Sequence, residues 1–102
     1  MVTFAEEILA KVSGEKVEAG DIVDASVDVA MSHDNAALVI KKFEEIGVKK
    51  VWDANKIVII LDHRVPANTI KTAEAHKKIR DFVRKHGIKN FYDINYGICH
   101  QV

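Results

Sequence analysis

Two histidine–aspartate pairs are the residues of this sequence best suited to acid–base chemistry. His33-Asp34 follows a stretch of alternating apolar residues, and Asp62-His63 follows an unbroken apolar run. Imidazole titrates near neutral pH, and a neighbouring carboxylate can fix its tautomer and raise its basicity. A third histidine, His100, falls within the last predicted strand. If these groups converge, proton transfer to or from a hydroxy acid is the chemistry that they would support.

The apolar patterns before both pairs predict β-strands. Residues 22–31 alternate with the period of two that is expected of a strand with one buried face. Residues 57–61 form the continuous β-branched run of a strand covered on both faces of a parallel sheet. Ligands bind at the carboxyl ends of strands in open α/β sheets. We therefore expect both pairs at one edge of a sheet, joined there by His100 if the last strand is parallel.

Capping residues and the helical spacing of apolar residues predict three helices. They are expected over residues 3–13, 36–46 and 70–86. A capping box, Thr3-Phe4-Ala5-Glu6, opens the first helix, and Asp34 or Asn35 is expected to cap the second. Glycines follow all three helices and suit the left-handed exit position. Residues 88–94 and 98–102 are further strand candidates, with a turn at 95–97 between them.

The order of these elements predicts an α/β fold, with a mostly parallel sheet flanked by helices in three layers, α/β/α. A chain of 102 residues suffices for one unit. The sequence stops inside an apolar stretch, so we expect residues 1–102 to be the N-terminal part of a domain that continues. An unpaired edge at the last strand would then expose apolar surface and favour self-association of the fragment.

Composition argues against several classes of partner. The sequence has 15 basic and 15 acidic residues and no basic run, so neither nucleic acid nor an acidic membrane is expected as a partner. It has no signal-peptide pattern and no apolar run approaching about 18 residues, which predicts neither export nor a membrane span. Its single cysteine, Cys99, excludes an intramolecular disulfide and favours a cytoplasmic location.

Both pairs also have a plain structural interpretation. His33-Asp34 would serve as a helix cap with a solvated imidazole, and Asp62-His63-Arg64 as a loop with an exposed ion pair. Neighbouring residues on a strand point to opposite faces, so Asp62 and His63 can touch only if the backbone turns after the strand. Val65-Pro66 makes such a turn plausible.

The other candidate residues favour structural roles. His76 and His86 lie within the long predicted helix, where packing or surface positions are the common outcome. Cys99 lies among apolar neighbours and is expected to be a buried, inert thiol. Trp52 is expected to pack at the entrance to a strand. The histidines show neither HxxxH nor HExxH spacing, so no metal site is predicted in this chain.

Four segments together resemble the beginning of the large subunit of an aconitase-family hydro-lyase. They are Gly20-Asp21, VDVAMSHD at 27–34, DHRVPA at 62–67 and GICHQ at 97–101. The combination of DHxVP with GICHQ is specific, whereas either alone would be weak. The match covers essentially the whole chain. It is most similar to the two-subunit type in this family, 3-isopropylmalate dehydratase and homoaconitase.

This resemblance implies a reversible dehydration and rehydration that moves a hydroxyl between neighbouring carbons of a carboxylic acid. In this family a [4Fe-4S] cluster with one open iron acts as the Lewis acid. Asp62 and His63 match the family's pair that serves the leaving hydroxyl, and His100 matches a histidine beside the cluster. The residues expected to contact the substrate are His33, Asp34 and Arg64.

The ligands of that cluster are not expected in this chain. The family takes its cluster cysteines from later segments, and Cys99 is not one of them. The sequence also departs from the family's usual pattern, with HDNA at 33–36 in place of HDGT and DHR at 62–64 in place of DHN. We expect the 102 residues alone to be inactive. The resemblance implies that the complete protein works with a separate small subunit on a small carboxylic acid.

Two alternatives stay open at this point. The substrate could be 3-isopropylmalate or homoaconitate, because in this family a loop of the small subunit contacts the variable substituent. In another class, the chain could be a stand-alone α/β binding or assembly domain without catalysis. A reading frame that continues beyond Val102 into the family's later motifs would favour the enzyme.

Overall fold

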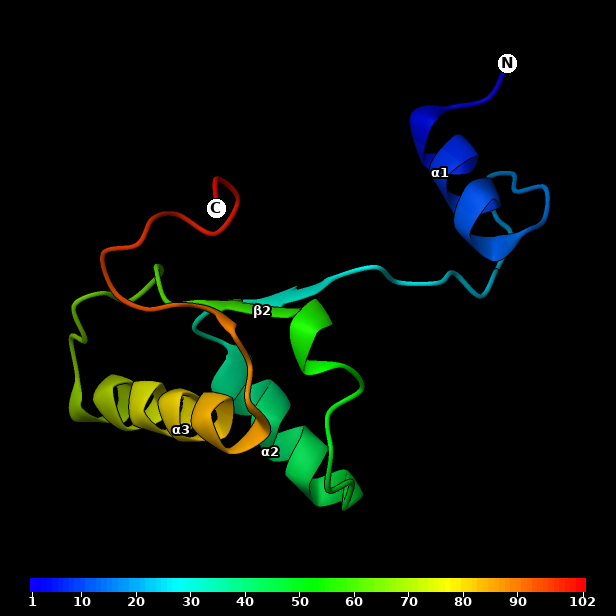
Figure 1. The fold of residues 1–102 in the computed structure, drawn as a ribbon. Coiled ribbons are helices and arrows are strands. Elements are labelled where there is room, and N and C mark those ends of the chain that lie inside the picture. The colour runs from blue at the N-terminus through cyan, green and yellow to red at the C-terminus, as the bar shows by residue number, and fades with distance from the viewer.

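The computed structural model describes residues 1–102 and contains three α-helices, one short 3-10 helix and three strands (Figure 1). In chain order these are α1 (Phe4–Ser13), β1 (Ala30–Ser32), α2 (Ala36–Ile46), η1 (Ala54–Lys56), β2 (Ile57–Ile60), α3 (Ile70–His86) and β3 (Asn90–Tyr92). The predicted helices and the central strand are confirmed, with bounds within a residue or two of those expected from the sequence.

The sheet has the order β1-β2-β3, and both pairings are parallel. Ala30 is paired with Ile57, and Ile59 is paired with Phe91. The predicted strand over 22–31 is much shorter than expected, because only its last residues reach β2 and form a ladder. Val27 and Val29 precede that ladder and are more than half exposed. The alternating apolar residues that precede β1 therefore do not form the buried face of a strand in this chain.

Both α2 and α3 lie on the same side of the sheet (Figure 1). This follows from the strand order, since right-handed crossovers that step in one direction across a sheet place their helices on one face. The α/β class and the parallel sheet are confirmed. Of the three expected layers, this chain supplies the sheet and one helical layer, and the remaining helix, α1, stands away from the sheet.

A small apolar core joins the sheet to this helical layer. Its buried members are Ala36, Ile40, Ile59, Leu61, Ile79, Val83 and Ile88. The inner face of α3 buries Thr72, His76, Ile79 and Val83, which follow one another at the three- and four-residue spacing of a helical stripe. Because one of these four is a histidine, the core meets a polar group at the carboxyl edge of the sheet.

Helix α1 is well capped but does not join the core. Thr3 and Glu6 form the predicted capping box, and Gly14 has the left-handed conformation at the other end. None of the residues of α1 is buried. The radius of gyration is 16.5 Å, whereas a compact domain of this length has about 13 Å. None of the helices is long and apolar enough to cross a membrane.

The predicted strand over 98–102 is wrong. This segment is a turn, in which the amides of Gln101 and Val102 both donate to the carbonyl of Ile98, at 2.8 and 3.0 Å. The turn predicted at 95–97 lies slightly earlier, at 93–96, where the amide of Tyr96 donates to the carbonyl of Asp93 at 3.2 Å. Gly97 follows it with a φ of 140°, a conformation that favours glycine. Ile98 and Val102 remain more than half exposed, so self-association through this region stays a prediction.

Candidate active site

The Asp62–His63 pair lies in the turn that follows β2, and its two side chains are in contact. Oδ1 of Asp62 lies 2.5 Å from Nδ1 of His63, so the expected change of backbone direction after the strand is present. The other carboxylate oxygen, Oδ2, accepts the backbone amide of Cys99 at 2.7 Å. The side chain of Asp62 is 7% exposed and that of His63 is 48% exposed. The pair therefore has a buried carboxylate and an imidazole that solvent or a substrate can reach.

The surroundings of Asp62 keep it ionised. Burial raises its pKa, but hydrogen bonds from the Cys99 amide and from His63 outweigh that effect, and the net pKa lies below the ordinary value. Burial and the adjacent Asp62 carboxylate both raise the pKa of the Cys99 thiol, which favours its protonated form. An ionised carboxylate facing Nδ1 favours a proton on that nitrogen and leaves Nε2 to exchange a proton with a ligand.

His33 lies beside this pair. Its ring stacks on the ring of His63, with centroids 4.0 Å apart and planes inclined by 13°. It follows β1 directly, so the ends of two neighbouring strands bring the two imidazoles together, as expected from the sequence. The amide of Asn35 donates to Nδ1 of His33 at 3.4 Å. This stacking limits how far either ring can rotate.

Asp34 does not cap α2, for which Asn35 is the N-cap residue without a side-chain bond. Instead, Oδ1 of Asp34 accepts the amides of Asp62 and His63 at 2.9 and 3.0 Å, and Oδ2 accepts the amide of Arg64 at 2.9 Å. We call this arrangement the Asp34 anchor.

A fourth contact, from Nε2 of His76 at 3.1 Å, reaches Oδ2 of Asp34. A carboxylate offers about four acceptor positions, so the acceptor capacity of Asp34 is used. Asp34 is also buried, at 8% exposure. Asp34 was expected to contact the substrate, but neither of its carboxylate oxygens has a free acceptor position.

His76 was expected to be a packing or surface residue, but it is a polar member of this site. It is 2% exposed and comes from the inner face of α3. The sequence could have indicated this role, because His76 lies on the apolar stripe of the helix, where a buried histidine needs a hydrogen-bond partner. That partner, Asp34, lies 42 residues earlier in the chain, which is why the helix pattern alone did not reveal it.

Acid is expected to release the Asp34 anchor. Burial raises the pKa of Asp34, but the three amides and His76 lower it from 3.8 to about 2. The folded-state pKa is the lower one, so this group stabilises the fold above about pH 4 and loses that contribution as the pH falls toward 2. Urea unfolding at several pH values should show the free energy of unfolding falling over this range, and falling less in Asp34→Asn.

Equal pH dependence in the two proteins would contradict this assignment. The comparison isolates Asp34 because two other carboxyls with lowered pKa values, Asp62 and Asp93, titrate in both proteins.

The GICHQ segment is held at the same edge of the sheet. The amide of Cys99 reaches Asp62, and the preceding turn is tied to α3 by Arg80, which donates from Nε and Nη2 to Asp93 at 2.8 Å each. His100 follows Cys99 in this turn and is exposed. Cys99 itself is buried, as expected, although its neighbours include the Asp62 carboxylate and are not all apolar.

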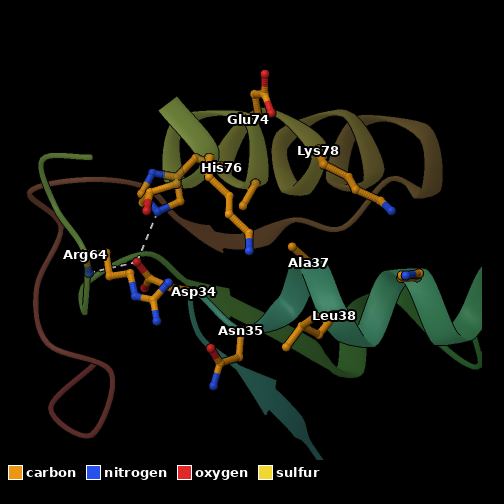
Figure 2. Close-up of a pocket in the computed structure, with 12 residues that line it drawn as sticks. Asp34, Asn35, Ala37, Leu38, Arg64, Glu74, His76 and Lys78 are labelled. Atoms are coloured by element: carbon orange, nitrogen blue, oxygen red, sulfur yellow. Dashed lines mark hydrogen bonds and ion pairs between the residues drawn. The ribbon is translucent and has the colours of Figure 1, made fainter. Parts of the chain in front are cut away.

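Arg64 lines a cavity of about 510 Å³ between α2 and α3 (Figure 2). Neither Asp62 nor His63 belongs to the lining of this cavity. Three lysines share the lining with Arg64, namely Lys41, Lys71 and Lys78. Arg64 thus follows the Asp62–His63 pair in the chain but borders a different opening, one on the helical side of the Asp34 anchor.

Two groups of potential metal ligands occur at this edge, His33 with Asp34 and His63, and Asp62 with His63 and Cys99. In each group the ligand atoms lie within 4.8 Å of one another. Both aspartates already accept hydrogen bonds from backbone amides. The network is therefore internally satisfied, and its donors and acceptors account for its geometry.

The chain was compared with known proteins, and no family model matches it. It is 52% identical over 101 residues to "3-isopropylmalate dehydratase large subunit 1" of Methanopyrus kandleri, a match that covers 98% of this chain and 24% of the relative. A "Probable 3-isopropylmalate dehydratase large subunit" of Methanothermobacter thermautotrophicus is 52% identical over 103 residues, covering 99% of this chain and 25% of the relative. The "Methanogen homoaconitase large subunit" of Methanocaldococcus jannaschii is 45% identical over 102 residues, covering 99% of this chain and 24% of the relative.

This chain, with a parallel α/β sheet and an aspartate–histidine pair at its carboxyl edge, is therefore similar over its whole length to part of a class of large subunits. The relatives in that class are named as large subunits of 3-isopropylmalate dehydratase and of homoaconitase. The resemblance inferred from the sequence motifs is confirmed. The chain spans about a quarter of the length of the curated relatives it matches.

Proposed function

We propose that this chain forms one wall of the active site of a hydro-lyase large subunit. The reaction interconverts 2-isopropylmalate and 3-isopropylmalate by dehydration and rehydration, a step of leucine biosynthesis. The observation that carries this proposal is the contact between a buried, ionised Asp62 and an accessible His63 at the carboxyl edge of the sheet. Relatives named as dehydratase large subunits support it.

In this mechanism Asp62 orients His63 by accepting a hydrogen bond from its Nδ1. His63 transfers a proton from Nε2 to the hydroxyl of the hydroxy acid, so the C–O bond breaks and the hydroxyl leaves as water, while a second base takes the proton of the neighbouring carbon as the C=C bond forms. On rehydration it takes the proton back from the attacking water. His33, stacked on His63, keeps the ring facing the substrate. His100 serves as a second acid–base group at the same edge. Arg64, expected from the sequence to contact the substrate, lines a separate opening and has no assigned role in this mechanism.

A [4Fe-4S] cluster, which the family resemblance implies, does not fit the residues of this chain. Such a cluster with one open iron needs three cysteine thiolates, and the chain has only Cys99. That thiol is buried and its pKa is raised, both of which oppose its acting as a ligand. The cluster ligands therefore belong to parts of the subunit outside these 102 residues, and none of the steps above is assigned to the cluster.

The 102 residues alone are expected to bind no iron and to show no dehydratase activity. This should hold after anaerobic reconstitution with iron and sulfide, because a single buried cysteine cannot hold the cluster. Metal analysis and the visible absorption spectrum measure the result, and the complete subunit treated in the same way serves as the positive control. Stoichiometric iron in the 102-residue chain would refute this assignment of ligands.

The proposed partners are a small subunit and a small hydroxy-carboxylic acid, in the cytoplasm. Large-subunit names among the relatives support a second polypeptide. A homoaconitase large subunit among the relatives favours homoaconitate as the second candidate substrate. The complete large subunit, purified with its small subunit and reconstituted, should be assayed on both acids. Turnover of 3-isopropylmalate well above that of homoaconitate is expected, and the reverse preference would assign the second function.

A further inference from the structure

One buried side chain, that of Asp34, holds the turn that carries the proposed catalytic pair. The Asp34 anchor takes three consecutive amides, those of residues 62, 63 and 64, on the two oxygens of a single carboxylate. These amides follow β2, whereas Asp34 follows β1, so the bonds join the ends of two neighbouring strands. The backbone of the turn can therefore move only if this carboxylate moves.

His76 fixes that carboxylate from a third element. Its Nε2 lies 3.1 Å from Oδ2 of Asp34, and the two side chains are 2% and 5% exposed. An ionised carboxylate accepts hydrogen bonds and cannot donate them, so the proton lies on Nε2 of His76. Figure 2 shows His76 reaching down from α3 to the Asp34 carboxylate, with Arg64 on the other side of it. With this bond the carboxylate is tied to α3 as well as to the two strands.

Resting on the function proposed above, we propose that Asp34 and His76 are positioning residues for the Asp62–His63 pair. They hold the turn at 62–64 so that His63 faces the substrate, and neither contacts the substrate itself. Both are buried, and the acceptor capacity of Asp34 is spent on the protein. A catalytic group displaced by about 1 Å can lose roughly a hundredfold in rate, so a small movement of this turn would matter.

The test uses the complete large subunit with its small subunit and compares His76→Leu, His76→Gln and Asp34→Asn. Two measurements are made, namely steady-state kinetics and hydrogen exchange of the amides at 62–64 by mass spectrometry. His76→Leu should lower kcat by about tenfold or more with little change in KM, because a displaced acid–base group acts on the transition state. Exchange at 62–64 should become at least about tenfold faster, while exchange in β2 stays unchanged.

His76→Gln keeps an N–H donor near the position of Nε2 and should recover most of the activity and most of the protection. Asp34→Asn should resemble His76→Leu, since its amide group presents a donor to the amide of Arg64 or to His76. His86→Leu, on the same helix but packed against Phe43 and Phe82, is the matched control and should leave exchange at 62–64 unchanged.

Three outcomes would overturn the proposal. A rise in KM with kcat unchanged would make these residues substrate ligands, and a loss of activity without faster exchange at 62–64 would exclude positioning. Faster exchange throughout β2 and α3 would show a general structural role. Failure of the proposed function is distinguishable, because an unmodified complex that turns over neither acid would still show whether the three amides are protected by Asp34.

Discussion

Replacement of His63 by alanine should reduce the turnover of the complete enzyme by about a hundredfold or more, the usual contribution of a positioned acid or base. The decrease should appear mainly in kcat, since the imidazole acts on a proton that moves only in the transition state. Steady-state kinetics of the reconstituted complex of both subunits measures the effect, and the iron content of each preparation must be equal for the comparison to hold.

His86→Ala is the matched control for this substitution. His86 lies at the far end of α3 and packs against Phe43 and Phe82 instead of the carboxyl edge of the sheet. Its replacement should leave kcat within about twofold of the unmodified enzyme, as is usual for a group remote from the reacting atoms. Full activity in His63→Ala would remove His63 from the mechanism and leave the Asp62 carboxylate without its assigned role.

Ile79→Ala should lower the free energy of unfolding by about 2–5 kcal/mol. Ile79 is fully buried, at 0% exposure, and lies in the core between α3 and the sheet. Its truncation removes apolar contacts and leaves a cavity that neighbouring residues fill only in part. Urea unfolding of the 102-residue chain, followed by circular dichroism, should show a lower midpoint or no folded baseline at all.

The same substitution at the start of the same helix provides the control. Ile70 is 81% exposed, so Ile70→Ala should change the free energy of unfolding by less than about 0.5 kcal/mol. Equal effects of the two substitutions would mean that the core between α3 and the sheet is not formed in solution.

Local patterns were sufficient to predict the helices and the central strand. The bounds of α3 followed from Thr69 at its start and Gly87 at its end, both of which act within one turn of the helix. The run at 57–61 was recognisable because a strand covered on both faces needs apolar residues at successive positions. The sequence indicated that Asp62 and His63 can touch only if the backbone turns directly after the strand, and the structure has both the turn and the contact.

Contacts between distant parts of the chain could not be read from those patterns. Asp34 was assigned to a helix cap or to the substrate, but its partners lie 28 to 42 residues away. An alternating segment forms a strand only where a neighbour pairs with it, and residues 22–29 find none in this chain. For residues 98–102 the apolar composition suggested a strand, whereas bonds back to Ile98 close a turn.

The anchor at the carboxyl edge also bears on how this site can change in evolution. Asp34 binds peptide amides, which every residue except proline provides, and it forms no hydrogen bond with the side chains at 62–64. The residue after the Asp62–His63 pair can therefore vary without moving the pair. Arg64, which stands where the family usually has asparagine, illustrates this freedom. A change of side chain at that position leaves the backbone contacts that hold the turn in place.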